Sequence, residues 1–211
     1  MDLTEANHKI PIDGKWDLED LYRFPRAYEQ VYFLLYSLLP HEDEWVQERI
    51  EYAFKQYPWR GGYSAVNFYN KLKCTLPKKE RPQVISLQYA SPGWIELSLI
   101  IGVAVAGERI VKAIATAIKE ANSTYQEIHR GMQERKLLRI EVEKKELELE
   151  QKHQQFIESR AERMVKLLGL SGVEQMNQKT GSPLKTLKIL LSLYRRIRTL
   201  AEYQNKGKTK L

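Results

Sequence analysis

The stretch that most constrains the fold is Ser91–Ile118, SPGWIELSLIIGVAVAGERIVKAIATAI, the most apolar part of an otherwise polar chain. A transmembrane helix needs about 20 consecutive apolar residues, and the run from Leu97 to Gly107 is about half that length. Glu108 and Arg109 then interrupt it. The stretch is therefore better explained as part of a protein core than as a membrane span.

The helical phase of this stretch supports a core position. At about 100° per residue, its polar and charged residues gather on one side of a helix and its apolar residues fill the rest. We predict a helix from about Pro92 to Lys119, half sunk in the core, with Ser91 as its N-cap. A partner or oligomer interface and membrane insertion are the alternatives. Gly102 and Ala106 are candidate positions for close helix–helix packing.

Two further helices are expected near the N-terminus. Residues 16–40, WDLEDLYRFPRAYEQVYFLLYSLLP, predict a helix with Asp17 as N-cap, which Pro25 breaks or restarts. Residues 42–54, EDEWVQERIEYAF, predict a second helix with an acidic first turn. The inward-facing residues of the second helix are expected to be Trp45, Ile50 and Phe54.

A small antiparallel sheet is expected beside these helices. Residues 83–90, QVISLQYA, place Ile85, Leu87 and Tyr89 on one side, which predicts a half-buried strand. Residues 8–13, HKIPID, are its expected partner, and Pro11 would confine that partner to an edge of the sheet. Residues 63–76 are compatible with either a strand or a short helix.

Residues 123–168 are dense in good helix formers and contain no proline. They predict one long charged helix, or two nearly continuous ones, that projects, bridges or pairs with a copy of itself. A heptad-like spacing joins Leu138, Val142, Leu149 and Phe156, as in a coiled coil with a thin apolar stripe. A β-hairpin is the alternative, because RIEVE and ELELE alternate with period two.

The last helix has the clearest apolar seam. Ser182 and Pro183 are expected to open it, and residues 205–211 to form a short, mobile basic tail. The candidate packing residues of the seam are Leu187, Leu190, Tyr194 and Ile197. The opposite side carries candidate residues for binding an anionic partner, namely Lys185, Lys188, Arg195 and Arg196.

The formal net charge of +7 is concentrated at the C-terminus, where residues 171–211 contain nine basic and two acidic residues. Such a face could meet nucleic acid, lipid head groups or an acidic protein, or it could simply be solvated. Trp59, Arg60 and Tyr63 form a candidate aromatic loop that could stack on bases. Aromatic residues beside a turn can equally be core anchors.

Patterns typical of catalysis are missing from the sequence. None of the four histidines has a second His or Cys at zinc-ligand spacing, and no serine or cysteine lies in a nucleophile-elbow motif. The Gly207–Thr209 tripeptide GKT lacks the first glycine of a phosphate-binding loop. We therefore expect no catalytic or metal-binding residues, no cofactor and no enzymatic activity.

The single cysteine, Cys74, excludes an internal disulfide framework. The N-terminal residues have neither the basic region nor the apolar region of a signal peptide. The expected location is the cytoplasm.

Three stretches carry a resemblance to known proteins: residues 62–72, GYSAVNFYNKL; residues 81–97, RPQVISLQYASPGWIEL; and residues 184–208, LKTLKILLSLYRRIRTLAEYQNKGK. They resemble a group of uncharacterised bacterial proteins in which a strand ending in Tyr-Ala-Ser-Pro-Gly runs into an apolar helix. The resemblance implies a bacterial cytoplasmic protein and, by analogy of fold, an accessory component of a defence system. It assigns no functional residues.

These observations predict a mostly α (α+β) protein in which a small antiparallel sheet packs with amphipathic helices and a long charged helix protrudes. The expected parts are a compact body at 1–120, a long coiled-coil-like helix at 121–170, and a basic amphipathic helix at 171–211 that packs on the body. The expected function is non-catalytic assembly, through helices that contact a second copy or a protein partner. Nucleic-acid binding through the last helix and peripheral membrane association are the alternatives.

Overall fold

The computed structural model describes residues 4–56, 62–137 and 144–211. These residues form eight α-helices, one short 3-10 helix and a three-stranded antiparallel sheet, so the predicted mostly α (α+β) class is confirmed. In chain order the elements are β1 (Glu5–Ile12), α1 (Leu18–Ser37), α2 (Glu44–Gln56), α3 (Gly62–Thr75), η1 (Lys78–Glu80), β2 (Gln83–Gln88), β3 (Gly93–Ile100), α4 (Ile101–Thr116), α5 (Ile118–Glu134), α6 (Lys144–Leu167), α7 (Val173–Thr180) and α8 (Pro183–Asn205).

Contacts between residues divide the chain into two compact units. Unit 1 comprises Met1–Leu39, Leu76–Ile118 and Arg195–Leu211, and unit 2 comprises Pro40–Thr75 and Lys119–Tyr194. Unit 1 thus contains the sheet, α1, α4 and the C-terminal part of α8. The division into segments 1–120, 121–170 and 171–211 stays a prediction.

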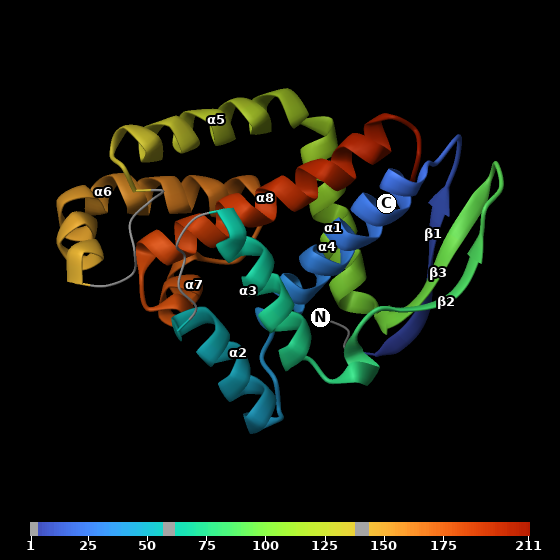
Figure 1. The fold of residues 1–211 in the computed structure, drawn as a ribbon, viewed down its shortest axis with the longest axis horizontal. Coiled ribbons are helices and arrows are strands. Elements are labelled where there is room, and N and C mark those ends of the chain that lie inside the picture. The colour runs from blue at the N-terminus through green and yellow to red at the C-terminus, as the bar shows by residue number, and fades with distance from the viewer. Residues whose placement is uncertain (1–3, 57–61, 138–143) are drawn as a thin grey trace. The chain divides into compact units, whose positions relative to one another are not determined.

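The sheet of unit 1 has the order β1-β3-β2, with β3 in the centre (Figure 1). β1 pairs antiparallel with β3 so that Ile10 lies opposite Ile95, and β2 pairs antiparallel with the other side of β3. The predicted pairing of residues 8–13 with residues 83–90 is therefore wrong. Both segments are strands, but a third strand lies between them.

That third strand corrects the prediction for the apolar stretch. Residues 93–100 were expected to be helical, but they form β3, and α4 begins only at Ile101. Ile95, Leu97 and Leu99 are buried and alternate with half-buried residues, the period of a strand. Ser91 and Pro92 precede β3, so they do not open a helix. The long apolar stretch is thus a central strand followed by a helix of 16 residues.

The first helix follows the sequence prediction at its start and departs from it inside. Asp17 and Asp20 form a capping box at the N-terminus of α1. Pro25 lies within α1, and the helix continues through it to Ser37. On the α4 side, a Cβ built on Gly107 would lie 3.5 Å from Leu35 Cδ1, so the glycine gives the two helices room to pack closely.

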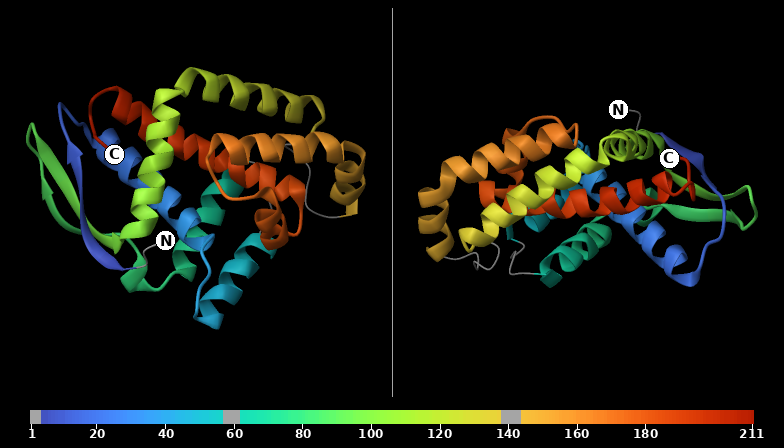
Figure 2. Two further views of the ribbon diagram at one scale, coloured as in Figure 1. Left: turned by 180° about the vertical axis from the view of Figure 1, so that it is seen from behind. Right: turned by 90° about the horizontal axis from the view of Figure 1, so that it is seen from above.

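The C-terminal residues of unit 1 are docked, which corrects the prediction of a mobile tail. Thr209 forms a bridge with Ile12 at the end of β1, and Leu211 is buried. Lys208 Nζ donates to the carboxylate of Asp20. Both views in Figure 2 show the C-terminus close to β1. Backbone pairing and an ion pair fix these residues. Both contacts involve distant parts of the chain, so the charge and glycine content of the tail did not predict them.

Unit 2 is built around the first part of α8, in which every residue from Leu184 to Tyr194 is buried. Ser182 opens α8 as predicted, because its Oγ accepts a hydrogen bond from the Lys185 N–H at 3.3 Å. The Tyr194 ring stacks on Tyr125 with centroids 5.0 Å apart. α8 is thus a core helix in this unit.

The charged region after α4 forms two helices in place of one. α5 and α6 lie side by side in unit 2 (Figures 1 and 2), and Glu127 of α5 pairs with Arg163 of α6 at 2.7 Å. The predicted alternative of two helices is therefore correct in number. The two helices do not follow one another in nearly continuous fashion, as predicted, but lie side by side. The hairpin is wrong for ELELE, which belongs to α6, while RIEVE lies outside the described residues.

The other helices of unit 2 settle two smaller predictions. Residues 63–75 are helical, as α3. In α2, Ile50 and Phe54 are buried as predicted, but Trp45 is 56% exposed and Val46 takes the inward position. The Arg49 guanidinium covers the Trp45 ring, 4.3 Å from its centroid.

Candidate functional site

The main candidate site is an apolar groove in unit 1, which we call the β2–α1 groove. It has a volume of about 520 Å³ and lies between α1 and the inner face of the sheet. Ligand pockets usually have volumes of about 300–1,000 Å³ and mostly apolar walls with a few polar groups, and this groove fits both criteria. Its lining residues are Ile10, Leu21, Tyr22, Phe24, Pro25, Arg26, Tyr28, Glu29, Pro82, Val84, Leu87, Ile95 and Leu97.

The groove exists because α1 covers the sheet unevenly. Ile10 and Leu97 are buried, whereas Val84 is 66% exposed and Leu87 is 53% exposed on the edge strand β2. Every residue of β2 is exposed or half-buried. The expectation of a half-buried strand at 83–90 is therefore wrong, because the apolar side of β2 extends beyond the part of the sheet that α1 covers.

A β-bulge in β2 places two apolar side chains on the side of the strand that faces the groove. The register with β3 shifts between Val84 and Ser86, leaving Ile85 as the extra residue. Val84 and Leu87 are three positions apart, yet both line the groove. Strict alternation would have placed them on opposite faces of the sheet. The sequence pattern therefore predicted Ile85 and Leu87 on one side and missed Val84.

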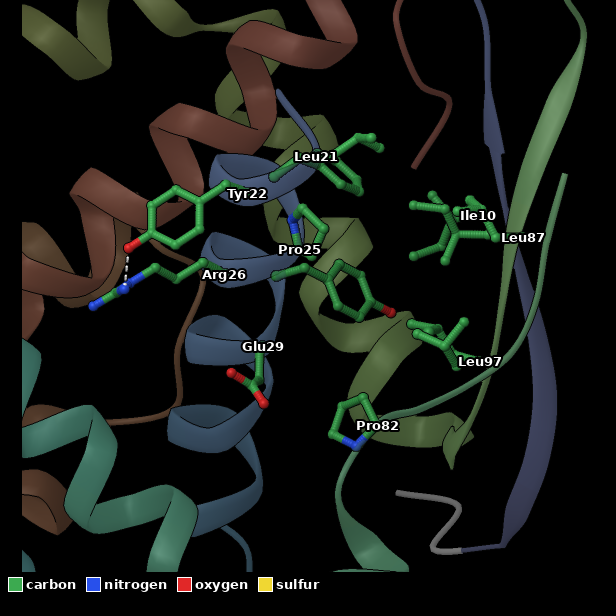
Figure 3. Close-up of a pocket in the computed structure, with 13 residues that line it drawn as sticks. Ile10, Leu21, Tyr22, Pro25, Arg26, Glu29, Pro82, Leu87 and Leu97 are labelled. Atoms are coloured by element: carbon green, nitrogen blue, oxygen red, sulfur yellow. Dashed lines mark hydrogen bonds between the residues drawn. The ribbon is translucent and has the colours of Figure 1, made fainter. Parts of the chain in front are cut away.

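On the helix side, α1 presents two different surfaces. Figure 3 shows Leu21 and Pro25 directed toward Ile10 and Leu87 of the sheet, while Tyr22 is directed to the other side of the helix. Proline has no N–H, so Pro25 makes no helical hydrogen bond to the carbonyl of Leu21. The helix therefore turns an apolar surface toward the groove.

A second hollow, which we call the arginine depression, lies on the other side of α1. Its volume is about 250 Å³, and α1 and the C-terminal part of α8 both line it, within unit 1. Tyr22 and Arg26 line both this hollow and the groove. Its lining residues are Tyr22, Arg23, Arg26, Ala27, Gln30, Arg195, Arg196 and Thr199.

Fixed partners hold the guanidinium groups of the arginine depression. Arg196 Nε donates to Gln30 Oε1 at 2.8 Å, and Gln30 is only 7% exposed. Arg26 donates to the Tyr22 hydroxyl, and its guanidinium lies 5.4 Å from the Tyr22 ring centroid. Arg23 Nη1 donates to Glu19 at 2.9 Å on the exposed side of α1.

The four basic residues expected to bind an anion are not brought together. Arg195 and Arg196 line the arginine depression of unit 1, whereas Lys185 and Lys188 belong to unit 2, where both are buried. Lys185 Nζ donates to the Lys55 carbonyl at 2.7 Å, at the C-terminal end of α2. A helix C-terminus attracts cations, so this lysine has a structural partner inside the fold.

The expected packing residues lie in different settings. Gly102 and Ala106 of α4 are half-buried. Leu187, Leu190, Tyr194 and Ile197 are fully buried within the chain, so their seam is not displayed on the surface. Trp59 and Arg60 lie outside the described residues, and Tyr63 falls in α3.

Sequence reasoning missed Arg23 and Arg26 as candidates. They lie three residues apart on α1, a spacing that puts two side chains on one side of a helix. That local signal was present. Their proximity to Arg195 and Arg196 follows from tertiary packing alone.

The described part of the chain contains no group of three or more His, Cys, Asp and Glu residues able to hold a metal ion. Within the same residues, the helices are all too short or too polar to cross a membrane. Comparison with protein-family models, with curated proteins and with solved structures finds no match to this chain. The groove and the depression are therefore the features of this chain that bear on its function.

Proposed function

We propose that this chain is a non-catalytic assembly protein that pairs with a second copy of itself along the outer edge of β2. The observation that carries the proposal is an exposed, uncharged edge strand beside an apolar groove. Helix-mediated contact through α8 would need an exposed seam, and residues 184–194 are all buried. The contact is therefore assigned to the strand.

Natural edge strands usually carry features that prevent pairing with another chain, such as lysine, proline or a bulge. Residues Gln83–Gln88 include neither a charged residue nor a proline. The bulge at Ile85 protects only the first half of the strand, because the register with β3 is regular from Ser86 to Gln88. An edge of this kind favours a partner strand.

Pairing two copies of β2 also covers the groove. In an antiparallel pair, a two-fold axis perpendicular to the sheet relates the two strands, and both sheets keep their inner faces on the same side. The three-stranded sheet is thereby doubled, and the two β2–α1 grooves adjoin. Val84 and Leu87 of each copy then face apolar side chains in place of water.

Covering the apolar side chains supplies part of the free energy of pairing. Burying a whole Val or Leu side chain stabilises by about 1.5–3 kcal/mol. Val84 and Leu87 are each more than half exposed, so covering them contributes about 1 kcal/mol per side chain. The two-fold symmetry doubles that contribution, and the backbone hydrogen bonds between the strands add to it.

The test is the oligomeric state of purified protein at tens of micromolar, measured by light scattering coupled to size exclusion. We expect a dimer for the unchanged chain and a monomer for Val84→Asp/Leu87→Asp, because pairing would then bury carboxylates without partners. The matched control is Val105→Asp on α4, which changes another exposed valine of unit 1 outside the groove. That variant should remain dimeric.

Two results would overturn the assembly proposal. One is a monomeric unchanged chain at these concentrations. The other is a dimer that survives the double substitution while far-ultraviolet circular dichroism confirms that each variant is folded.

We further propose a bacterial cytoplasmic setting and an accessory role in a defence system. This rests on the resemblance of residues 81–97 to bacterial proteins that share the Tyr-Ala-Ser-Pro-Gly motif, although in this chain the motif leads from β2 into β3 and not directly into a helix. Its test is independent of the first: deleting the gene from its bacterial host should impair resistance to a challenge such as phage infection, and supplying the unchanged gene should restore it.

A further inference from the structure

We propose that the arginine depression is a binding site for a ligand that carries two or three closely spaced phosphate groups. The site is distinct from the assembly contact, because it lies on the α8 side of α1 and the groove lies on the sheet side. Only Tyr22 and Arg26 border both hollows.

The arginine depression concentrates positive charge. Four guanidinium groups, those of Arg23, Arg26, Arg195 and Arg196, line a hollow of about 250 Å³. Of these, Arg23 also pairs with Glu19, which lies outside the lining. Like charges gathered at short range repel one another, and the repulsion is relieved when an anion occupies the space between them. The planar fork of arginine matches the geometry of phosphate oxygens.

Neighbouring side chains orient the arginines of the depression. The side-chain amide of Gln30 is buried, and its oxygen fixes Arg196 through Nε, while Arg26 is held against the Tyr22 ring. Side chains that are already ordered lose less conformational entropy when a ligand binds. The depression therefore resembles a prepared site more than a group of mobile surface arginines.

The amount of charge in the depression selects the ligand. A single carboxylate carries one negative charge and a phosphate monoester about two. Adjoining phosphates therefore come closer to balancing the arginines of the depression, even though Arg23 also pairs with Glu19. A nucleic-acid backbone needs a row of cations, because duplex DNA carries one charge per about 1.7 Å of its axis. Such a row along α8 is interrupted, since Lys185 and Lys188 are buried. The compact hollow favours a small oligophosphate group.

The experiment titrates the full chain with inorganic tripolyphosphate by calorimetry. Arg23→Gln/Arg26→Gln removes two lining guanidiniums from the exposed side of α1 and should weaken binding at least about tenfold, since charge-assisted hydrogen bonds are lost. The matched control is Arg109→Gln/Arg198→Gln, which removes the same charge from unit 1 outside the depression. It should bind within about twofold of the unchanged chain.

A second variant keeps the charge and changes the geometry. Arg195→Lys/Arg196→Lys retains two cations but loses the planar forks, and it should also weaken tripolyphosphate binding. If this pair binds as the unchanged chain does, the site is a mere accumulation of charge and the proposal is wrong. Thermal unfolding of each variant checks that the fold is retained.

The same phosphate chemistry can come from a soluble ligand or from a lipid head group. Vesicles containing phosphatidylinositol bisphosphate distinguish them: binding that free tripolyphosphate displaces assigns the site to the lipid, and tripolyphosphate binding without vesicle binding assigns it to a soluble ligand. The proposal fails if the unchanged chain does not bind tripolyphosphate, or if the matched control loses binding equally. It also fails if a single-stranded oligonucleotide displaces tripolyphosphate and binds more tightly, because the depression would then be part of a nucleic-acid surface.

Failure of this proposal is distinguishable from failure of the assembly proposal. Val84→Asp/Leu87→Asp should abolish the dimer and leave tripolyphosphate binding intact, because neither residue lines the depression. Arg23→Gln alone, at a residue that lines the depression and not the groove, should weaken tripolyphosphate binding and leave the dimer intact.

Discussion

Two tyrosines one turn apart on α1 should respond in opposite ways to the loss of their hydroxyl groups. Both side chains are buried, at 7% exposure for Tyr28 and 2% for Tyr32. Tyr32 donates to the Glu80 carbonyl at 2.8 Å and accepts from the Ile100 N–H at 3.0 Å. The Tyr28 hydroxyl is buried and has no hydrogen-bond partner among the described residues.

The two environments set the magnitudes. Tyr32→Phe deprives two backbone groups of their partner, and leaving a buried polar group unsatisfied costs about 1–3 kcal/mol. We expect this variant to lose about 2–3 kcal/mol of unfolding free energy. Tyr28→Phe removes a hydroxyl that is desolvated without compensation, so it should be neutral or stabilise by up to about 1 kcal/mol.

Urea unfolding monitored by circular dichroism measures both variants against the unchanged chain. The slope of free energy against urea should stay constant, so the shift in midpoint reports the change in stability. Equal destabilisation by the two substitutions would refute the reasoning, because it would mean that Tyr28 has a hydrogen-bond partner after all. Such a result would also change the description of the groove wall, which Tyr28 lines.

The pH dependence gives the same comparison a second readout. Burial, more than the nearby carboxylates, raises the pKa of Tyr32 from 10.0 to about 12. Below pH 10 the stability that the buried, protonated hydroxyl of Tyr32 contributes is fully present. Above pH 10 the unfolded chain loses the proton first, so the contribution is lost as the pH rises toward 12. Tyr32→Phe should therefore lose less stability over that interval than the unchanged chain.

Two further substitutions test the packing of unit 1. Burial by itself raises the pKa of Asp20, but hydrogen bonds from Lys208 and Tyr203 outweigh it, so the pKa lies below its usual 3.8. Asp20→Asn should cost about 1.5 kcal/mol at neutral pH, and the difference from the unchanged chain should vanish as the pH falls below 3.8, measured by urea unfolding across that range. Gly93→Ala should destabilise by about 2–3 kcal/mol, because the added Cβ would collide with the backbone carbonyl of Gln88; a thermal midpoint equal to that of the unchanged chain would contradict this.

Local signals predicted two of the helix starts correctly, although the same kind of signal at Ser91 and Pro92 was misleading. The capping box at Asp17 and Asp20 and the Ser182–Pro183 start of α8 depend on residues a few positions apart, and both are present. The class was predictable for the same reason, since most of the chain forms helices whose periodicity can be read over a short window.

The error at residues 93–100 has a physical cause. Ile95, Leu97 and Leu99 satisfy a strand period, while the apolar residues that follow satisfy a helical one, so the whole stretch read as a single apolar helix. β3 is a strand because it pairs with β1 on one side and β2 on the other. Those pairings join residues up to 95 positions apart, for example Glu5 and Ile100. Such contacts decide between helix and strand when local patterns conflict.

The buried lysines of α8 show a different limit. A helical projection places Lys185 on the charged side, and charged residues are usually solvated. Lysine has a long apolar stem, so its ammonium group can reach a polar partner while the stem packs in the core. Here the partner is the carbonyl of Lys55, 130 positions away. The sequence of α8 alone contains no information about that carbonyl.

The candidate sites were beyond sequence reasoning because each combines distant segments. The groove joins Ile10, Leu21 and Leu87, and the depression joins Arg23 and Arg196. Two partial signals existed, namely an uncharged strand at 83–88 and the arginine spacing on α1. Neither signal identifies the distant residues that line the other side of the groove or of the depression.

The same packing holds both sites in place. α1 is anchored on α4 by close contact at Gly107, where a Cβ would lie 3.5 Å from Leu35 and 3.7 Å from Val31. From that anchored side, α1 turns Leu21 toward the sheet and Arg23 toward the arginine depression. A site on a rigid helix keeps its geometry better than one on a loop. Substitutions that enlarge Gly107 should therefore weaken both assembly and phosphate binding, whereas changes at Val84 or Arg23 should affect one alone.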